Sequence, residues 1–304
     1  MVLSGSQAKG LQITPRYMEL HRMPDSIRTT EPVAGYPVYE IDHPTCTARV
    51  ALHGAHVMEW QPKHVSDPVL YLSPEAVLRE GKAIRGGIPV CWPWFNAHPT
   101  DPSLPSHGFA RSTFWKTGEF STDGDAVTLR FTFEKGAWHA ELRLSLGEAL
   151  EAELTTTNRG DQPVPVSGAL HSYLRVGDIS AIHIEGFDGC GYLDTVGAPA
   201  ARRQDGPVRF DSEVDRIYDT HGSSRLVDPT LHRTITVEKS GSPSTVVWNP
   251  WIEKAAALGD LPDEGYKDFV CIEAAIANDL AVRLAPGESH KFSTRIRVEE
   301  ERRL

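Results

Sequence analysis

Cysteine is scarce in this sequence, and no cysteine is placed for a metal or redox motif. The chain has 304 residues and four cysteines, which are Cys46, Cys91, Cys190 and Cys271. No two of them form a C-x-x-C pair, so a zinc ribbon or a dithiol redox centre is not indicated. Widely spaced single cysteines favour free thiols in a reducing compartment.

Long apolar runs and positive charge are also in short supply. No stretch is long and apolar enough to span a bilayer, and the first residues lack the apolar segment of a signal peptide. The 31 Lys and Arg residues oppose 41 Asp and Glu residues, which gives a formal net charge of −10. Without a lysine-rich run, this balance disfavours nucleic acid or an anionic membrane surface as a partner. We therefore expect a cytoplasmic protein with neither partner.

Several well-known catalytic motifs are missing as well. The sequence contains no G-x-x-x-x-G-K-[ST], no G-x-G-x-x-G after a strand, no H-E-x-x-H and no G-x-S-x-G. Readings as a P-loop or dinucleotide-binding protein, a zinc protease or a serine hydrolase therefore lose support. Heptads, fixed-period repeats and low-complexity linkers are absent too. This pattern favours a single domain and a monomer.

Alternating apolar and polar residues are abundant and predict antiparallel strands with one buried face. The segments expected to form strands are 37–42, 47–62, 126–134, 140–146, 150–156, 234–239, 244–249, 269–276 and 292–298. Residues 186–232 predict long loops with short strands, and residues 250–267 predict a loop. The best helix candidate is Ser73–Gly81, with Ser73 as cap, Pro74 in the first turn and Gly81 at the end. The fold class is all-β: one large antiparallel β-sandwich with few short helices.

The expected domain organisation is simple. Residues 1–28 are weakly patterned and are interpreted as an N-terminal extension, at most partly ordered. Residues 29–304 are interpreted as a single β-sandwich domain.

The segment Ile84–Arg111 predicts an irregular, rigid loop. It contains five prolines and three glycines, which no regular helix or interior strand tolerates at that density. It also contains Trp92, Trp94 and Phe95, which a solvent-exposed linker would not need. Because function concentrates in loops held on a stiff scaffold, we interpret it as one wall of a binding site.

A few polar residues stand out as candidates for chemistry. Glu273 is the single charge in the apolar run 269–276, and a buried carboxylate is either paired structurally or functional. His171 lies in a strand-like segment and is either structural or a proton-transfer group. His107 follows the proline-rich stretch and either contacts a ligand or braces the loop. Arg85 and Arg111 could hold a phosphate or carboxylate with their planar forks, or form surface salt bridges.

These motifs together resemble one family. The chain resembles the hexose-6-phosphate mutarotases, a branch of the aldose 1-epimerase family, over roughly residues 35–298. The matching motifs occur in the family's order: IRGGIPVCWPWF (84–95), SHGFAR (106–111) followed by Trp115, ALHSYLRV (169–176), EVDRIY (213–218), the stretch from VWNPWIEK to FVCIEAA (247–275), and APGES (285–289). One such motif is weak evidence, whereas the ordered set is specific.

The resemblance implies a galactose-mutarotase-like sandwich that interconverts the α and β anomers of a hexose 6-phosphate, with glucose 6-phosphate as the favoured substrate. It implies His171 and Glu273 as the general acid/base pair, without metal or cofactor. It also implies that substrate contacts come from Arg85, Ser106, Arg111 and Asp215. The family often has Gln where this chain has Ser106, and a shorter side chain reaches the substrate less directly.

The expected chemistry is proton transfer at the two oxygens of the hemiacetal. His171, as an imidazolium, would protonate the ring oxygen, while Glu273 would take the proton of the C1 hydroxyl. Trp92, Trp94 or Trp251 could pack on the sugar or belong to the core. Two other functions remain open: an aldose 1-epimerase acting on unphosphorylated sugars, and a sugar-phosphate-binding protein without catalysis.

Overall fold

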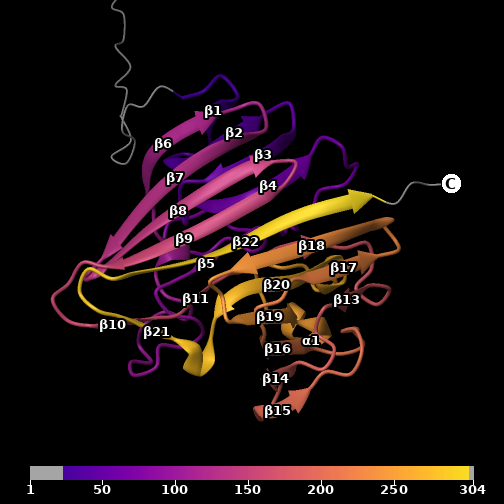
Figure 1. Cartoon of the computed structure of the whole chain (residues 1–304). Coiled ribbons are helices and arrows are strands. Elements are labelled where there is room, and N and C mark those ends of the chain that lie inside the picture. Colours follow the sequence, from indigo (N-terminus) through magenta and orange to yellow (C-terminus); the bar gives the residue numbers. More distant parts are fainter. Residues whose placement is uncertain (1–22, 301–304) are drawn as a thin grey trace, which may run out of the picture.

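Antiparallel β-strands dominate the computed structural model, which describes residues 23–300. Two eight-stranded sheets make up most of the sandwich, and a four-stranded sheet packs behind the strands of residues 116–158 in one of them (Figure 1). The strands of the four-stranded sheet follow the chain order: β1 (Ile27–Val33), β2 (Tyr36–Asp42), β3 (Cys46–Ala51) and β4 (His56–Pro62). β10 (Val164–Val166) and β21 (Val282–Leu284) form a separate small pair.

The first large sheet has the spatial order β13-β17-β18-β22-β9-β8-β7-β6. Its strands are β6 (Lys116–Thr122), β7 (Ala126–Lys135), β8 (Trp138–Gly147), β9 (Leu150–Asn158), β13 (His183–Glu185), β17 (Ser224–Asp228), β18 (Arg233–Ser240) and β22 (Ser289–Glu300). Buried and partly exposed residues alternate strictly along β9, as the sequence pattern predicts for a strand with one face in the core.

The second large sheet has the order β15-β14-β16-β19-β20-β11-β5, and β12 also pairs with β20. Its strands are β5 (Val90–Cys91), β11 (Gly168–Leu170), β12 (Tyr173–Arg175), β14 (Gly191–Asp194), β15 (Ala200–Arg203), β16 (Val214–Asp219), β19 (Ser244–Asn249) and β20 (Phe269–Ile276). Every residue of β20 is buried, which identifies it as the central strand of this sheet.

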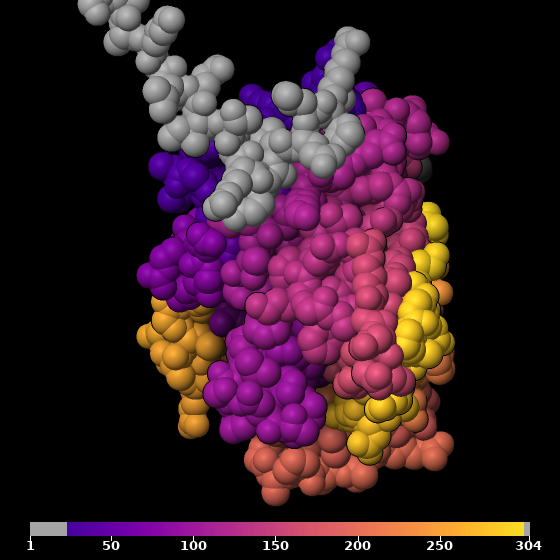
Figure 2. Space-filling model, turned by 90° about the vertical axis from the view of Figure 1, so that its left-hand side faces the viewer, coloured from indigo at the N-terminus to yellow at the C-terminus, as the bar shows by residue number. Residues whose placement is uncertain are grey.

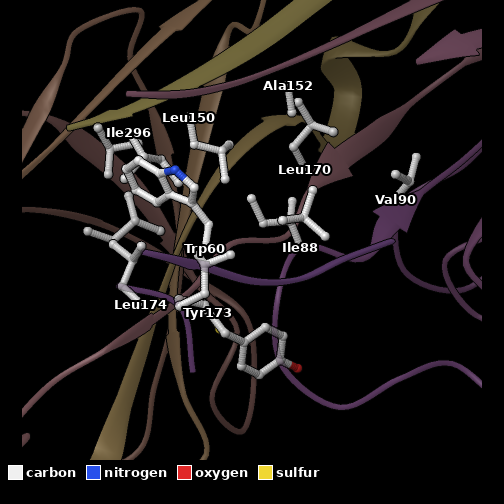
Figure 3. Close-up of a cluster of buried hydrophobic side chains, with 14 of the residues drawn as sticks. Trp60, Ile88, Val90, Leu150, Ala152, Leu170, Tyr173, Leu174 and Ile296 are labelled. Atoms are coloured by element: carbon white, nitrogen blue, oxygen red, sulfur yellow. The ribbon is translucent and has the colours of Figure 1, made fainter. Parts of the chain in front are cut away.

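The hydrophobic core fills the space between the sheets. Figure 3 shows Leu150 and Ile296 of the first large sheet, Leu170 of the second and Trp60 of the four-stranded sheet gathered in one cluster. Each such fully buried side chain contributes about 1.5–3 kcal/mol relative to an exposed one. Ile272 of β20 belongs to this core, and successive side chains of a strand point to opposite faces of the sheet. Glu273, the next residue, therefore points to the opposite face of the sheet.

The structure corrects two local predictions. Residues 73–81 form no helix: Ser73 is buried, and its hydroxyl donates to the carbonyl of Asp260 at 2.7 Å, so a long-range contact fixes this segment after a single turn. The predicted loop 250–267 contains the short helix α1 (Trp251–Ala256) and a 3-10 turn, Gly265–Asp268. Asn249 organises both, because its side chain accepts from the Trp251 amide and donates to the Tyr266 carbonyl.

The amino-terminal boundary also differs in detail. Strand β1 starts at Ile27, inside the predicted extension, and pairs with β2. Residues 1–22 lie outside the described residues, so the extension itself stays a prediction. No helix within residues 23–300 is long and apolar enough to cross a membrane.

The segment 84–111 is irregular, as predicted, apart from the two-residue strand β5 and the start of a 3-10 turn (Ala110–Ser112). Its exposed middle, around residues 96–106, projects from the surface in Figure 2. Trp92 and Trp94 are buried, and their indole nitrogens donate to Thr156 and to the Pro105 carbonyl. Trp92 therefore anchors the loop to the core, whereas Trp94 braces the loop internally.

One glycine in this loop gives a stability prediction. Gly108 has φ +73°, and a Cβ there would lie 2.0 Å from the carbonyl oxygen of Trp92. Gly136, in the turn between β7 and β8, has φ +59° and open space around its Cβ position. We expect Gly136→Ala to cost about 1 kcal/mol from the positive φ alone. Gly108→Ala should cost about 1–3 kcal/mol more because of the clash.

Urea unfolding of the two variants and the wild type measures this difference. Equal losses in the two variants would show that the contact between Gly108 and Trp92 relaxes at no cost.

Candidate active site

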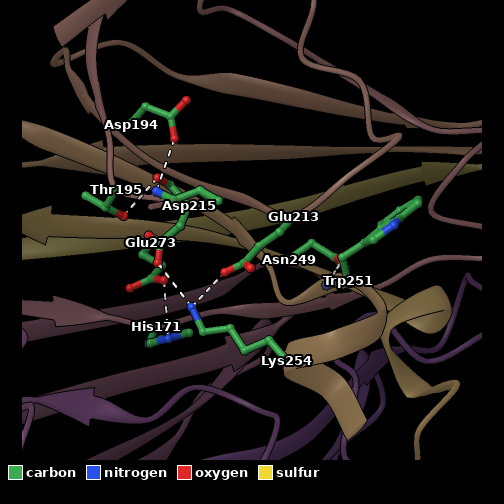
Figure 4. A network of polar contacts seen from close by, with 10 residues as sticks. His171, Asp194, Thr195, Glu213, Asp215, Asn249, Trp251, Lys254 and Glu273 are labelled. Atoms are coloured by element: carbon green, nitrogen blue, oxygen red, sulfur yellow. Dashed lines mark hydrogen bonds and ion pairs between the residues drawn. The ribbon is translucent and has the colours of Figure 1, made fainter. Parts of the chain in front are cut away.

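A break between two short strands places His171 beside Glu273. β11 pairs with β20 as far as Leu170, and β12 resumes the pairing at Tyr173 opposite Cys271. The His171 amide, within this break, donates to the carbonyl of Pro89, in the loop that precedes β5. As a result, Nε2 of His171 lies 3.3 Å from Oε1 of Glu273 (Figure 4).

Burial sets the protonation of this pair. Glu273 is 1% exposed and His171 8% exposed. Desolvation raises the pKa of Glu273 well above its ordinary value, and the negative charge of Asp215 adds to this, whereas Arg111 opposes it. Desolvation also lowers the pKa of His171 well below its ordinary value, helped by His107, Arg111 and Arg85. The free site thus favours a neutral carboxyl and a neutral imidazole.

Two atoms of the pair have no partner. Within residues 23–300, Nδ1 of His171 and Oε2 of Glu273 are buried and make no hydrogen bond. Buried polar atoms are usually satisfied, so orphaned ones mark places where a ligand or a proton transfer supplies the missing partner.

Asp215 approaches the pair from the neighbouring strands. It lies on β16 opposite Trp248 of β19, and Trp248 in turn lies opposite Cys271 of β20. Nζ of Lys254, on α1, lies 3.7 Å from Oδ2 of Asp215 and 2.8 Å from Oε1 of Glu213 (Figure 4). Burial raises the pKa of Asp215, and Lys254 works against that rise.

Arg85 is held by two partners at the other side of His171. Its Nε donates to Oδ1 of Asp260 at 3.0 Å, and its Nη1 donates to the hydroxyl of Tyr173 at 2.9 Å. Two of the three guanidinium nitrogens are therefore engaged by the protein, which leaves Nη2 for a ligand. The fixed guanidinium adds positive charge next to His171.

The SHGFAR motif closes the site from the loop. Nη2 of Arg111 donates to the carbonyl oxygen of Ser106 at 3.0 Å, while Ser106 itself is exposed. Nδ1 of His107 accepts from the Asn96 amide, and its backbone bonds to Trp92 and Asn96, so His107 braces the loop. Its ring centroid is also 6.2 Å from that of His171. Burial, with Arg111 and Arg85, lowers the pKa of His107 to about 3, which keeps the ring neutral.

The structure thus gathers most of the residues singled out from the sequence around one point, the His171–Glu273 pair. They are Arg85, His107, Arg111, His171, Asp215 and Glu273. Ser106 is not among them, because its side chain is exposed and only its carbonyl oxygen bonds to Arg111. No group of three or more His, Cys, Asp or Glu residues suited to a metal ion occurs in residues 23–300.

Four further residues belong to this site and were not singled out from the sequence. Tyr173 stacks on His171, with ring centroids 4.8 Å apart and an interplanar angle of 11°. Trp248 meets His171 edge-on, at 5.8 Å and 83°. Lys254 and Asp260 hold Asp215 and Arg85. Their signal was their place inside the family motifs, because residue type alone does not separate them from surface or core residues.

Comparison with known proteins identifies the family. The family model described as Aldose 1-epimerase matches residues 37–297. A Salmonella typhimurium protein provisionally named glucose-6-phosphate 1-epimerase is 36% identical over 248 residues, which cover 78% of this chain and 82% of that protein. The family match confirms the resemblance stated from the sequence motifs.

Solved structures agree with the sequence match. A protein from Salmonella typhimurium, provisionally described as a mutarotase, superposes with a TM-score of 0.85 at 30% identity, covering 93% of this chain and 96% of that one. A galactose mutarotase-like protein from Lactobacillus casei shares the fold with a TM-score of 0.68 at 15% identity, covering 86% and 100%. The all-β sandwich predicted from the sequence is thereby confirmed. The chain belongs to the aldose 1-epimerase family and is an isomerase that interconverts the anomers of a sugar.

Proposed function

We propose that the substrate is a hexose 6-phosphate, with glucose 6-phosphate preferred. The observation that carries this proposal is the pair of arginines, Arg85 and Arg111, on the His171 side of the site in a chain of net charge −10. A neutral sugar needs no such pair, whereas a phosphate dianion accepts charge-assisted hydrogen bonds from guanidinium groups. The provisional name of the Salmonella typhimurium relative points to the same substrate.

We propose that His171 and Glu273 exchange protons with the hemiacetal. With substrate bound, the carboxyl proton of Glu273 first passes to Nε2 of His171, 3.3 Å away. His171 then donates a proton to the ring oxygen while the Glu273 carboxylate accepts the proton of the C1 hydroxyl, and the C1–ring-oxygen bond breaks. The aldehyde rotates about C1–C2. On closure His171 regains a proton from the freed hydroxyl and Glu273 returns one to the carbonyl oxygen, so protons balance over the cycle.

Substrate binding helps to prepare the pair for this reaction. In the free site, the positive charges of Arg111 and Arg85 contribute to the low pKa of His171. A dianion on these arginines offsets that contribution and makes the imidazolium easier to form. Asp215, held beside Lys254, is proposed to accept hydrogen bonds from sugar hydroxyls.

The direct test is the rate of anomer exchange measured by NMR. Micromolar protein should accelerate equilibration of α-glucose 6-phosphate well above the buffer rate, and more strongly than that of glucose or galactose. Equal acceleration of glucose and glucose 6-phosphate would replace the phosphate assignment with an enzyme for unphosphorylated sugars. No acceleration of any of the three would refute catalysis at this site.

Arg111 tests the phosphate assignment more finely. Arg111→Ala should raise KM for glucose 6-phosphate about tenfold or more, because a hydrogen bond to a charged group is worth about 1.5–3 kcal/mol. The rate with free glucose should change little. Arg111→Lys, the matched control, keeps the charge and loses the fork, so its KM should fall between the two. Parallel losses on both sugars would mean that Arg111 only braces the loop through Ser106.

Glu273→Gln separates chemistry from stability. Turnover should fall on the order of 10²–10⁴-fold with little change in substrate affinity, because the amide cannot accept the proton.

In the folded protein the pKa of Glu273 lies above its ordinary value near 4.5, so the folded state binds this proton more tightly than the unfolded chain. Wild-type stability contributed by this group therefore falls as pH rises above about 4.5.

The glutamine variant lacks this loss. Because glutamine does not titrate, the free energy of unfolding of Glu273→Gln minus that of the wild type should increase from pH 4.5 to 8. Urea unfolding at several pH values measures this difference. A stability difference that does not depend on pH would contradict the raised pKa, and a wild-type rate would exclude Glu273 as the base.

A further inference from the structure

Tyr173 contacts both His171 and Arg85 of the proposed site. Its side chain is only 2% exposed, so it acts through the residues that it touches. One face of its ring stacks on His171, and its hydroxyl accepts a hydrogen bond from Arg85. We propose that Tyr173 is a positioning residue, which fixes the imidazole plane of His171 and ties it to the guanidinium of Arg85. This inference rests on the proposed function for the part that concerns phosphate.

The first support is that Nδ1 of His171 makes no hydrogen bond, among the described residues, that would orient the ring. A histidine that transfers protons is usually oriented by a hydrogen bond on its second ring nitrogen. In the described part of the chain, Nδ1 of His171 has no such partner. Aromatic contacts take its place: Tyr173 lies parallel to the ring and Trp248 meets it edge-on, which forms a slot for the imidazole.

The second support is that Tyr173 is itself held in several ways. Its amide donates to the Gly87 carbonyl at 2.9 Å, and its carbonyl accepts from the Tyr71 amide at 3.0 Å. Its ring also packs against Phe269, with centroids 5.1 Å apart. Gly87 lies two residues after Arg85, so both the main chain and the side chain of Tyr173 fasten the Arg85 segment to the strand that follows His171.

The third support is the order of contacts across the site. Asp260 accepts from Nε of Arg85, Arg85 donates through Nη1 to Tyr173, and Tyr173 stacks on His171. Burial raises the pKa of Tyr173, so its phenol stays neutral and can accept from the guanidinium. A ligand that shifts Arg85 would therefore also shift the His171 ring, because Tyr173 contacts both side chains.

Tyr173→Phe tests the link to Arg85, because it keeps the ring and removes the hydroxyl. KM for glucose 6-phosphate should rise about tenfold, and by a larger factor than KM for free glucose. Tyr39→Phe is the matched control: Tyr39 is equally buried, and its hydroxyl bonds to Thr117 away from the site. A Tyr173→Phe variant that behaves like Tyr39→Phe on both sugars would overturn the link.

Tyr173→Leu tests the stack, because it keeps apolar bulk and loses the aromatic plane. Turnover should fall about tenfold or more on both sugars, and ¹⁵N NMR of the imidazole should show a changed tautomer balance for His171. Tyr173→Phe should leave those signals as in the wild type. His171 signals that do not change in Tyr173→Leu would overturn the positioning role, even if the activity fell through lost stability.

The two proposals can fail separately. If the wild type shows no preference for glucose 6-phosphate, the phosphate assignment fails, whereas the His171 signals in the two Tyr173 variants still decide the stack. If that preference is present and the signals are the same in all variants, the positioning role alone fails.

Discussion

The burial of one carboxyl group is the constraint on which the rest of this structure depends. Glu273 lies in β20, a strand whose residues are all buried, with its side chain on the face opposite the sandwich core. A carboxylate in such a place is costly in free energy, so the protein keeps the proton on the group instead of the charge. The fold thereby gives up stability at neutral pH, and the raised pKa suits the proton-transfer role proposed for this group.

The sandwich makes this arrangement possible because each of its parts fixes one member of the site. The first large sheet packs on the core face of β20, and the short strands β11 and β12 pair with its edge. The break between β11 and β12 frees His171 from regular pairing, while its amide stays bonded to Pro89. Glu273 thus lies on a strand and His171 in the break between two strands, while Trp92 fixes the loop 84–111 to the core by its bond to Thr156.

The positive charge around His171 is opposite in sign to the net charge of the protein. The chain is acidic, yet two guanidinium groups sit where they lower the pKa of His171. Asp260 and Tyr173 fix the guanidinium of Arg85, so the proposed contact with a phosphate would require little rearrangement. Pairing with a carboxylate also limits the free positive charge that the buried region must carry.

The sequence by itself determined the all-β class, most strand positions and the candidate residues. Period-two alternation marks β7, β8 and β9, an apolar run marks β20, and the ordered motifs mark His171 and Glu273. The failures were local: Ser73–Gly81 has good capping residues, but a long-range bond from Ser73 to Asp260 overrides them. Only the tertiary structure decided the neutral state of the pair, the partners of Arg85 and the stack of Tyr173 on His171. Protonation depends on desolvation, and these contacts join residues far apart in the chain, so neither can be read from neighbouring residues in the sequence.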